Sequence, residues 1–331
     1  MAKRWTAQEI LDLSRSFQPA CVLTAAAALD VFSPLYAKPM TAIALAGQLG
    51  TDPRATAILL NALVALKFLS KQGEEYSVPE DVAGLLTEQS DDNVLPMFRH
   101  LANCLRRWAE LSKVTQTGKC AETGPSVRGA AADQADFIGA MNTISRPVAD
   151  KVIDKIQPSK FRHMLDIGGG PGTWTIAFLR AVPEAIATLF DLLAVVPMAG
   201  KQFAEAGLSD RVTLVGGDYY ADALPEGADL AWLGAICHQN SRRQNRDLFT
   251  RVHTALSDDG AIVIRDVIMD PSHTSPAGGA LFAVNMLVAT EVGGTYTFDE
   301  YRDDLQAAGF GEVTLVHRDE FMNSLIRAGK A

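Results

Sequence analysis

The sequence has few cysteines and no long apolar run, and each absence argues against a class of protein. Its four cysteines, Cys21, Cys104, Cys120 and Cys237, are scattered without a C-x-x-C pair, which argues against a structural zinc site and a disulfide framework. The most apolar early stretch, CVLTAAAALDVF, is short and contains Asp30, so it does not predict a membrane-spanning helix. The N-terminus has basic residues but no apolar segment behind them, which argues against export. We therefore expect a reduced, cytoplasmic protein that holds no metal.

Positive charge is also in short supply. Lys and Arg number 30 against 39 Asp and Glu, which gives a net charge of −9. Because phosphate recognition requires clustered cations, this balance argues against nucleic acid or an anionic membrane surface as the main partner. The 331 residues, 48% of them hydrophobic and 21% charged, suffice for two globular domains that each bury a core.

The first half of the chain is predicted to be mostly helical. One helix begins after Thr41 and ends at Gly50, and the next has Asp52 as its cap and Pro53 at its first position. The predicted buried stripe of this second helix comprises Ile58, Leu59, Ala62, Leu63 and Leu66. Two short strands that turn at Gly73 follow. Helix, turn, helix and hairpin is the outline of a winged helix.

A winged helix can bind DNA or serve in packing and dimerisation. Residues 41–80 contain three cations and four anions, a local net charge of −1. A recognition helix needs cations for the DNA phosphates, so this charge favours packing or dimerisation. A ligand-sensing transcriptional regulator stays open as the alternative.

From Met164 onward, strand-like and helical segments alternate. The predicted strands cover 164–167, 186–191, 212–218, 228–235 and 261–269, with helices around 173–182, 194–206, 241–256 and 279–290. This α/β alternation predicts a parallel sheet with helices on both faces and a ligand site at the carboxyl ends of the strands. After a further helix, EVTLVHR and MNSLIRA are too close in sequence for a parallel crossover and must pair antiparallel. Such a sheet resembles the Rossmann-like class I S-adenosylmethionine-dependent methyltransferase fold rather than a dehydrogenase.

The first strand of this sheet runs into the glycine-rich stretch LDIGGGPGT. Its spacing is Gly168-x-Gly170-x-Gly172, and Thr173 stands where a dinucleotide fingerprint has its third glycine. By itself this loop therefore indicates only that the nucleotide part of a cofactor binds here.

Acidic residues lie at successive strand ends around this loop. Asp166 precedes the first glycine, and Asp191 ends the second strand, where a carboxylate can accept hydrogen bonds from both ribose hydroxyls. Asp218 and Tyr219 end the third strand, where adenine would lie. The pattern predicts a cofactor site rather than a set of solvated caps.

Nearly the whole chain resembles the small-molecule O-methyltransferase family that includes plant caffeic acid and acetylserotonin O-methyltransferases. The resemblance rests on TAIALAGQLGTDPRATAILLNALVALKFL, LDIGGGPGT, ICHQNS and FDEYRDDLQAAGF. It implies a dimerisation domain over 1–100, a helical linker that roofs the acceptor pocket over 101–160, and a methyltransferase domain over 161–331. It also implies S-adenosylmethionine as methyl donor and a homodimer. The cofactor-binding residues that it implies are Asp166, Gly168, Gly170, Gly172, Asp191, Leu192, Gly217, Asp218, Tyr219 and Gly234.

The same resemblance makes His238 the general base and Asp266 the carboxylate that orients it. This chain departs from the family at three places near that base. Gln239-Asn240 replaces the usual Asp-Trp, Gly234 replaces a frequent lysine, and Thr295 or Tyr296 stands where a second carboxylate is expected. We therefore expect a base with one carboxylate partner, which favours a more acidic phenol or a non-standard reaction.

The acceptor pocket is expected between the segments FIGAMNTISR and LFAVNMLVATEVGG. Its candidate residues are Phe137, Met141, Asn142, Phe282, Asn285, Met286 and Ala289. Methionines suit adaptable contact with a flat ring. From the glycine loop, the acids at the strand ends and His238, we expect an O-methyltransferase that acts on an aromatic or polyketide-like hydroxyl. An N-, S- or C-methyltransferase, or a non-methylating enzyme that binds the same cofactor, stays open as an alternative.

Overall fold

The computed structural model describes residues 3–88, 90 and 92–330. The chain forms two compact units, which are described separately. Unit 1 comprises Met1–Arg106 and Thr123–Thr143, and unit 2 comprises Arg107–Glu122 and Ile144–Ala331. The division predicted at residues 100 and 160 stays a prediction.

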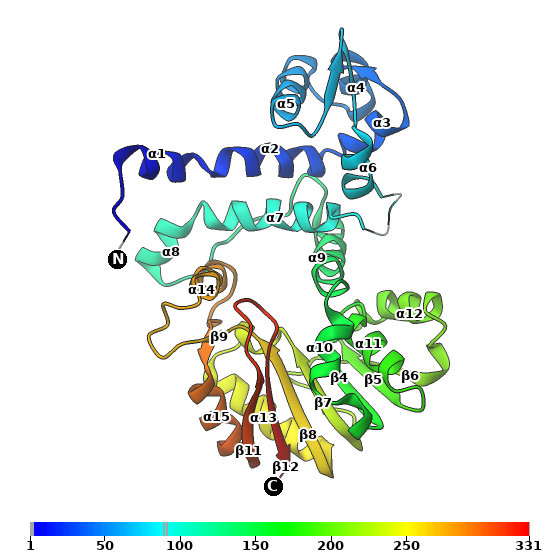
Figure 1. Cartoon of the computed structure of the whole chain (residues 1–331), viewed down its shortest axis with the longest axis vertical. Helices are drawn as coiled ribbons and strands as arrows, with labels where there is room; N and C mark the ends of the chain where they lie inside the picture. The colour runs from blue at the N-terminus through cyan, green and yellow to red at the C-terminus, as the bar shows by residue number, and fades with distance from the viewer. Residues whose placement is uncertain (1–2, 89, 91, 331) are drawn as a thin grey trace. The chain divides into compact units, whose positions relative to one another are not determined.

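Unit 1 is mostly helical, with one small sheet (Figure 1). Its helices are α1 (Ala7–Arg15), α2 (Phe17–Ala28), α3 (Phe32–Ala37), α4 (Ala42–Leu49), α5 (Pro53–Ala65), α6 (Glu80–Leu86), and most of α7 (Leu95–Trp108) and α9 (Ala130–Ser145). The strands β1 (Met40–Thr41), β2 (Ser70–Gln72) and β3 (Glu75–Ser77) pair antiparallel in the order β1-β3-β2.

The cap residues define α4 and α5 as the sequence predicts. The Thr41 hydroxyl accepts the Ala44 N–H at 3.2 Å, and Gly50 ends α4 in the left-handed conformation with φ 66°. The Asp52 carboxylate accepts the Ala55 N–H at 2.7 Å, and Pro53 opens α5. The hairpin of β2 and β3 follows, so the predicted order of helix, turn, helix and hairpin is present.

The buried face of α5 differs from the predicted stripe. Leu60 and Leu63 are fully buried, and Thr56 is buried one turn before Leu60, whereas Ile58 is 55% exposed. The apolar residues nearly encircle α5, and packing against α2 and α4 selects the face that is buried. The sequence pattern alone cannot make that selection.

Unit 2 is built on a seven-stranded sheet in the order β11-β12-β8-β7-β4-β5-β6 (Figure 1). The strands are β4 (His163–Ile167), β5 (Ile186–Asp191), β6 (Val212–Gly216), β7 (Ala228–Gly234), β8 (Leu256–Asp266), β11 (Phe310–His317) and β12 (Ser324–Lys330). Strands β4 to β8 are parallel, whereas β12 pairs antiparallel with both β8 and β11. The predicted terminal hairpin is thereby confirmed.

Unit 2 has seven helices in its described residues, and several of them cover the two faces of this sheet. The seven are α8 (Leu111–Thr117), α10 (Ala149–Lys155), α11 (Thr173–Ala181), α12 (Val196–Glu205), α13 (Arg242–Ala255), α14 (Ala277–Ala289) and α15 (Phe298–Ala307). Helices α10 and α11 enclose one core with the sheet, and α13 and α15 enclose another on the opposite face. The predicted strand 261–269 differs in detail, because β8 begins earlier and a separate short strand, β9 (Ile268–Met269), pairs with β10 (Tyr296–Thr297).

None of the helices in the described part of the chain is long and apolar enough to cross a membrane.

Gly172, the N-cap of α11, is expected to tolerate no side chain. Its φ is +80°, and a Cβ there would collide with the ring of Phe203. Strain of roughly 1–2 kcal/mol from the left-handed backbone adds to about 1–3 kcal/mol from overpacking. Gly172→Ala should therefore lower the free energy of unfolding by roughly 2–5 kcal/mol in a urea titration. Gly278→Ala is the matched control, because a Cβ there meets Phe321 at an ordinary 3.4 Å. Equal stability of the two variants would contradict the prediction that position 172 tolerates no side chain.

Candidate active site

The glycine-rich loop between β4 and α11 is fastened to the end of β5. The Gly168 N–H donates to the Phe190 carbonyl at 2.8 Å, and the Gly170 N–H donates to Asp191 Oδ2 at 2.7 Å. A Cβ on Gly168 would collide with the Ile236 side chain. The loop backbone therefore lies close to neighbouring elements, with α11 beginning directly behind it.

Asp166 lies beneath this loop and is almost fully buried. Its Oδ2 accepts the Thr175 hydroxyl at 2.7 Å, which ties the end of β4 to the first turn of α11. Burial raises the pKa of this carboxyl to about 7, with Asp191 adding to the rise and Thr175 opposing it. The structure shows the hydrogen bond between Asp166 and α11 behind the loop. Direct contact between Asp166 and a cofactor stays a prediction.

Asp191 is the polar group at the end of β5. Its two carboxylate oxygens accept the N–H groups of Gly170 and Leu192, each at 2.7 Å, while the Leu192 side chain is 51% exposed. Burial raises the pKa of Asp191, and the two backbone donors counter that rise. A carboxylate has about four lone-pair sites, so Asp191 can still accept further hydrogen bonds from hydroxyl groups.

The loop after β6 approaches the glycine loop. The Gly217 N–H donates to the Asp191 carbonyl at 2.9 Å, and the Asp218 carboxylate accepts the Tyr220 N–H at 2.8 Å. The Tyr219 ring packs on the Tyr220 ring at 4.4 Å and lies 4.0 Å from the position of a Cβ on Gly168. The predicted residues of three strand ends thus meet at one edge, although β6 ends at Gly216, before Asp218.

The predicted base and its predicted partner are in contact. His238 lies in a short 3-10 turn (Cys237–Gln239) after β7, and Asp266 ends β8. The imidazole Nδ1 is 2.9 Å from Asp266 Oδ1 and 3.1 Å from Oδ2, and the His238 N–H also donates to Oδ2 at 3.1 Å. An ionised carboxylate only accepts hydrogen bonds, so Nδ1 carries the proton and Nε2 is left as the basic nitrogen.

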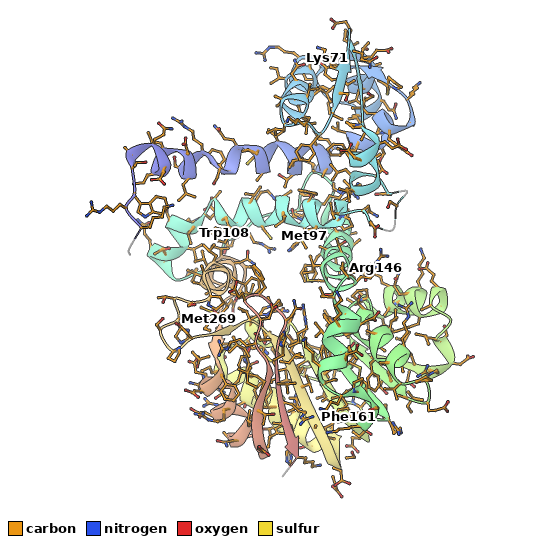
Figure 2. The ribbon with its side chains drawn as sticks, in the orientation of Figure 1. Lys71, Met97, Trp108, Arg146, Phe161 and Met269 are labelled. Atoms are coloured by element: carbon orange, nitrogen blue, oxygen red, sulfur yellow. The ribbon has the colours of Figure 1, made fainter. Side chains whose placement is uncertain are left out.

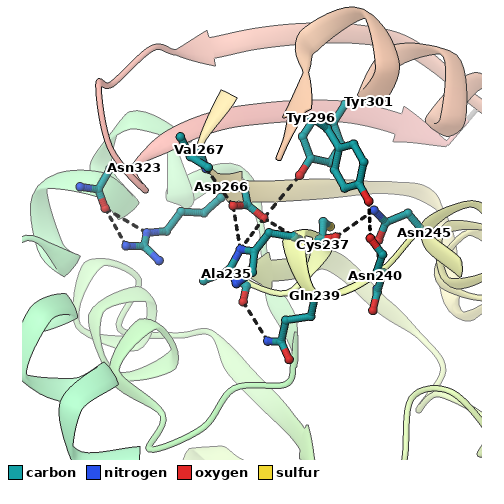
Figure 3. Close-up of polar contacts among 12 residues, drawn as sticks. Ala235, Cys237, Gln239, Asn240, Asn245, Asp266, Val267, Tyr296, Tyr301 and Asn323 are labelled. Carbon is teal, nitrogen blue, oxygen red and sulfur yellow. Dashed lines mark hydrogen bonds and ion pairs between the residues drawn. The ribbon is translucent and has the colours of Figure 1, made fainter. Parts of the chain in front are cut away.

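Further donors fix the Asp266 carboxylate itself (Figure 3). The Val267 N–H donates to Oδ1 at 2.8 Å, and the Tyr301 hydroxyl approaches Oδ2 at 3.4 Å. Burial, together with the Asp266 charge, raises the pKa of Tyr301 well above its ordinary value, so Tyr301 stays a neutral donor.

The structure supports neither Cys237 as a nucleophile nor an ion pair between Arg265 and Asp266. Cys237 is fully buried, and burial raises the pKa of its thiol well above the ordinary value, which leaves little reactive thiolate. Arg265 forms no ion pair with Asp266, because successive residues of β8 point to opposite faces of the sheet. The charged partner of Asp266 is therefore the His238 imidazole and not Arg265.

Asn240 connects the base to three other segments, a role that the sequence did not reveal. Its buried side-chain amide accepts from the Tyr220 hydroxyl and donates to Asn245 Oδ1 at 3.0 Å. Its carbonyl accepts the Tyr296 hydroxyl. Figure 3 draws Asn240 beside Asn245. The replacement of the family's tryptophan by a polar residue was the one available signal.

The segment that lacks the second carboxylate packs against the backbone of the base. The Gly294 N–H donates to the His238 carbonyl at 2.9 Å, and a Cβ on Gly293 would lie 2.6 Å from that same oxygen. Tyr296 contacts Asn240 as described. Gly294 and Tyr296 thus hold the turn that carries His238 by donating to its main-chain carbonyls.

The predicted acceptor residues are divided between the two units. On α14, Phe282 presents its ring edge-on to His238 at 4.8 Å, Met286 is buried, and Ala289 is the last residue of the helix. Trp108, which Figure 2 labels, donates its indole N–H to Asn285 Oδ1 at 2.9 Å.

In unit 1, Phe137 is 43% exposed and its ring lies 5.2 Å from that of His100. Met141 and Asn142 are partly buried on the same helix. The participation of these three residues in an acceptor site stays a prediction.

No group of three or more His, Cys, Asp or Glu side chains in the described ranges could hold a metal ion.

Comparisons with known proteins agree with this geometry. Residues 125–311 match the O-methyltransferase domain family, and residues 11–89 match the O-methyltransferase dimerisation domain. The chain is 30% identical to the tetracenomycin polyketide synthesis 8-O-methyl transferase of Streptomyces glaucescens over 92% of this chain and 91% of that protein. It is 29% identical to an N,N-dimethyltransferase of Streptomyces rimosus, over 92% and 90% of the two chains. The crystal structure of human N-acetylserotonin methyltransferase in complex with S-adenosylmethionine superposes with a TM-score of 0.82 at 24% identity, over 100% and 99% of the chains.

Stability should depend on pH through Asp166. A carboxyl whose pKa rises from 3.8 when unfolded to about 7 when folded binds its proton more tightly in the native state. The contribution of Asp166 to native stability is then greatest below pH 3.8 and falls as the pH rises to about 7. Asp166→Asn removes the charge, so its stability relative to wild type should climb over that interval, with a ceiling of about 4 kcal/mol. Thermal unfolding between pH 4 and pH 8, about the span of the two pKa values, measures this. Asp150→Asn, at an exposed position of α10, is the control. A difference between Asp166→Asn and wild type that stays constant with pH would contradict the prediction.

Proposed function

The chain belongs to the O-methyltransferase family and is a methyltransferase by that membership; from this premise we propose that it methylates a hydroxyl of an aromatic or polyketide-like small molecule with His238 as the general base. S-adenosylmethionine is the methyl donor. The observation that carries the proposal is the His238–Asp266 pair, which lies at the same sheet edge as the glycine loop.

The residues of that edge suit the adenosyl part of such a cofactor. A glycine loop without side chains permits close backbone approach, Asp191 can accept the ribose hydroxyls, and Tyr219 offers a ring for the adenine. When bound, the cofactor supplies an electrophilic methyl group on a sulfonium sulfur.

His238 removes the proton of the acceptor hydroxyl through Nε2. A phenol has a pKa of about 10 and an imidazole one of about 6.5, so complete transfer before attack would cost roughly 5 kcal/mol. A positioned base that takes the proton as the new bond forms contributes about 10²–10⁴-fold in rate. The negative Asp266 then stabilises the imidazolium, since the Nδ1–H already points at its carboxylate.

A homodimer formed through unit 1 is part of the same proposal. None of the residues of α1, all of which the structure describes, is buried, and Ile10, Leu11 and Leu13 are each about half exposed or more. Such a helix is not stabilised by its own chain, so a second copy of this chain is the partner that buries it. The match to a dimerisation domain over residues 11–89 supports this assignment.

His238→Ala should lower kcat for a phenolic acceptor by about 10²–10⁴-fold at neutral pH. Its rate should then increase with pH up to the acceptor's own pKa, because solvent ionises the hydroxyl when the base is absent. His163→Ala, at the amino end of β4, is the control with a histidine remote from the carboxyl edge. Full activity of His238→Ala, or a loss that is independent of pH, would exclude the base role.

Replacing Ile10 and Leu13 with glutamate should convert the dimer to a monomer in light scattering. The charges desolvate poorly at an apolar interface, and both side chains lie on a helix that its own chain leaves exposed. Val127→Glu, at an 83% exposed site of unit 1, should stay dimeric. A wild-type monomer at micromolar concentration, or a double variant that remains dimeric, would refute this interface.

A further inference from the structure

Trp232 carries a buried hydrogen-bond donor without an acceptor. Its side chain lies on β7 and is 0% exposed. Its indole Nε1 has no hydrogen-bond partner among the residues that the structure describes. A buried polar group left unpaired costs about 1–3 kcal/mol, so the position is suited to a ligand that provides an acceptor.

Arg265 is a buried cation close to this donor. Its side chain is 3% exposed, and its Nε and Nη2 both donate to one acceptor, Asn323 Oδ1, at 3.0 and 2.8 Å (Figure 3). Within the described part of the chain, no carboxylate lies within ion-pair distance of this guanidinium. Burial lowers the pKa of Arg265 to about 10, which still leaves it charged at neutral pH. A guanidinium has five N–H donors, and a single amide oxygen uses few of them.

The two groups belong to one cluster, and Gly234 lies against it. Gly234 and Arg265 are partners across β7 and β8. A Cβ on Gly234 would lie 2.6 Å from Trp232 Nε1 and 3.5 Å from Trp174 Cδ1. The Trp174 ring lies 4.2 Å from the Arg265 guanidinium carbon and 5.3 Å from the Trp232 ring. Trp174 is in the first turn of α11, so the cluster borders the glycine loop.

We propose that Arg265 and Trp232 bind the α-carboxylate at the amino-acid end of the methyl donor, beside Gly234. The inference rests on the proposed function and names a subsite of it. A carboxylate accepts several hydrogen bonds at once, which matches a free indole N–H beside a guanidinium.

The order of strands sets the direction of the ligand. Asp191 on β5 is assigned to the ribose and the loop after β6 to the adenine, and both strands lie on one side of β4. The amino-acid end leaves the ribose opposite the adenine, so it extends over β4 toward β7 and β8. Those two strands carry Trp232 and Arg265.

Binding of two adenosyl ligands tests the subsite. S-adenosylhomocysteine carries the carboxylate, whereas 5′-methylthioadenosine lacks the entire amino-acid end. In calorimetry on the full chain, Arg265→Met should weaken S-adenosylhomocysteine binding by about 10–100-fold and Trp232→Phe by about 3–10-fold. Both variants should bind 5′-methylthioadenosine within about twofold of wild type, since that ligand does not reach the subsite.

The remaining variants separate charge from structure. Arg265→Lys keeps the charge without the planar donor set, so its loss should be smaller than that of Arg265→Met. Arg180→Met, at the exposed end of α11, should bind both ligands as wild type does. If Arg265→Met fails to fold, the test of the subsite rests on Trp232→Phe, because this variant removes the indole N–H while keeping an aromatic ring.

The proposed subsite would be wrong if the variants bound both ligands equally more weakly than wild type. It would also be wrong if Trp232→Phe and Arg265→Met bound S-adenosylhomocysteine as wild type does. Failure of the proposed function looks different: without a methyl-donor site wild type itself would bind neither ligand, and an acceptor other than a hydroxyl would leave all of these binding results unchanged.

Discussion

The Asp266 carboxylate is the group on which the catalytic side of the sheet depends. It lies at the end of β8, almost fully buried, and it holds both the imidazole and the backbone N–H of His238. Removing such a charge from water is costly unless donors surround it, and the Val267 N–H and the Tyr301 hydroxyl complete that surrounding. The same contacts fix the histidine tautomer, so the imidazole proposed as the base is oriented before any acceptor arrives.

Strand alternation gives the sheet edge two opposite electrostatic characters. Arg265 and Asp266 are neighbours in sequence, yet Asp266 faces the core of α13 and α15 while Arg265 faces that of α10 and α11. A negative charge therefore accompanies the proton acceptor, and a positive charge lies beside the glycine loop. One strand end can in this way serve proton transfer on one face and anion recognition on the other.

Local sequence signals predicted the parts of this molecule whose cause is local. The caps at Thr41, Asp52 and Gly50 appear as expected, and the spacing of the last two strands was sufficient to fix their direction. The exposure of Ile58 was not predictable, since it depends on which neighbours pack against α5. The unpartnered indole of Trp232 was equally hidden, because it results from the absence of an acceptor among residues distant in sequence.

The departures from the family around the base form a single arrangement. Where a second carboxylate would contact the imidazole, Gly294 instead binds the His238 carbonyl and Tyr296 binds the Asn240 carbonyl. Asn240 in turn accepts the Tyr220 hydroxyl, next to the predicted adenine site. The turn that carries the base is thus held by its main chain rather than by a second charge. In the proposed mechanism the imidazolium gains only one negative partner, so its stabilisation is smaller. The proposal therefore favours an acceptor hydroxyl that loses its proton readily over a weakly acidic one.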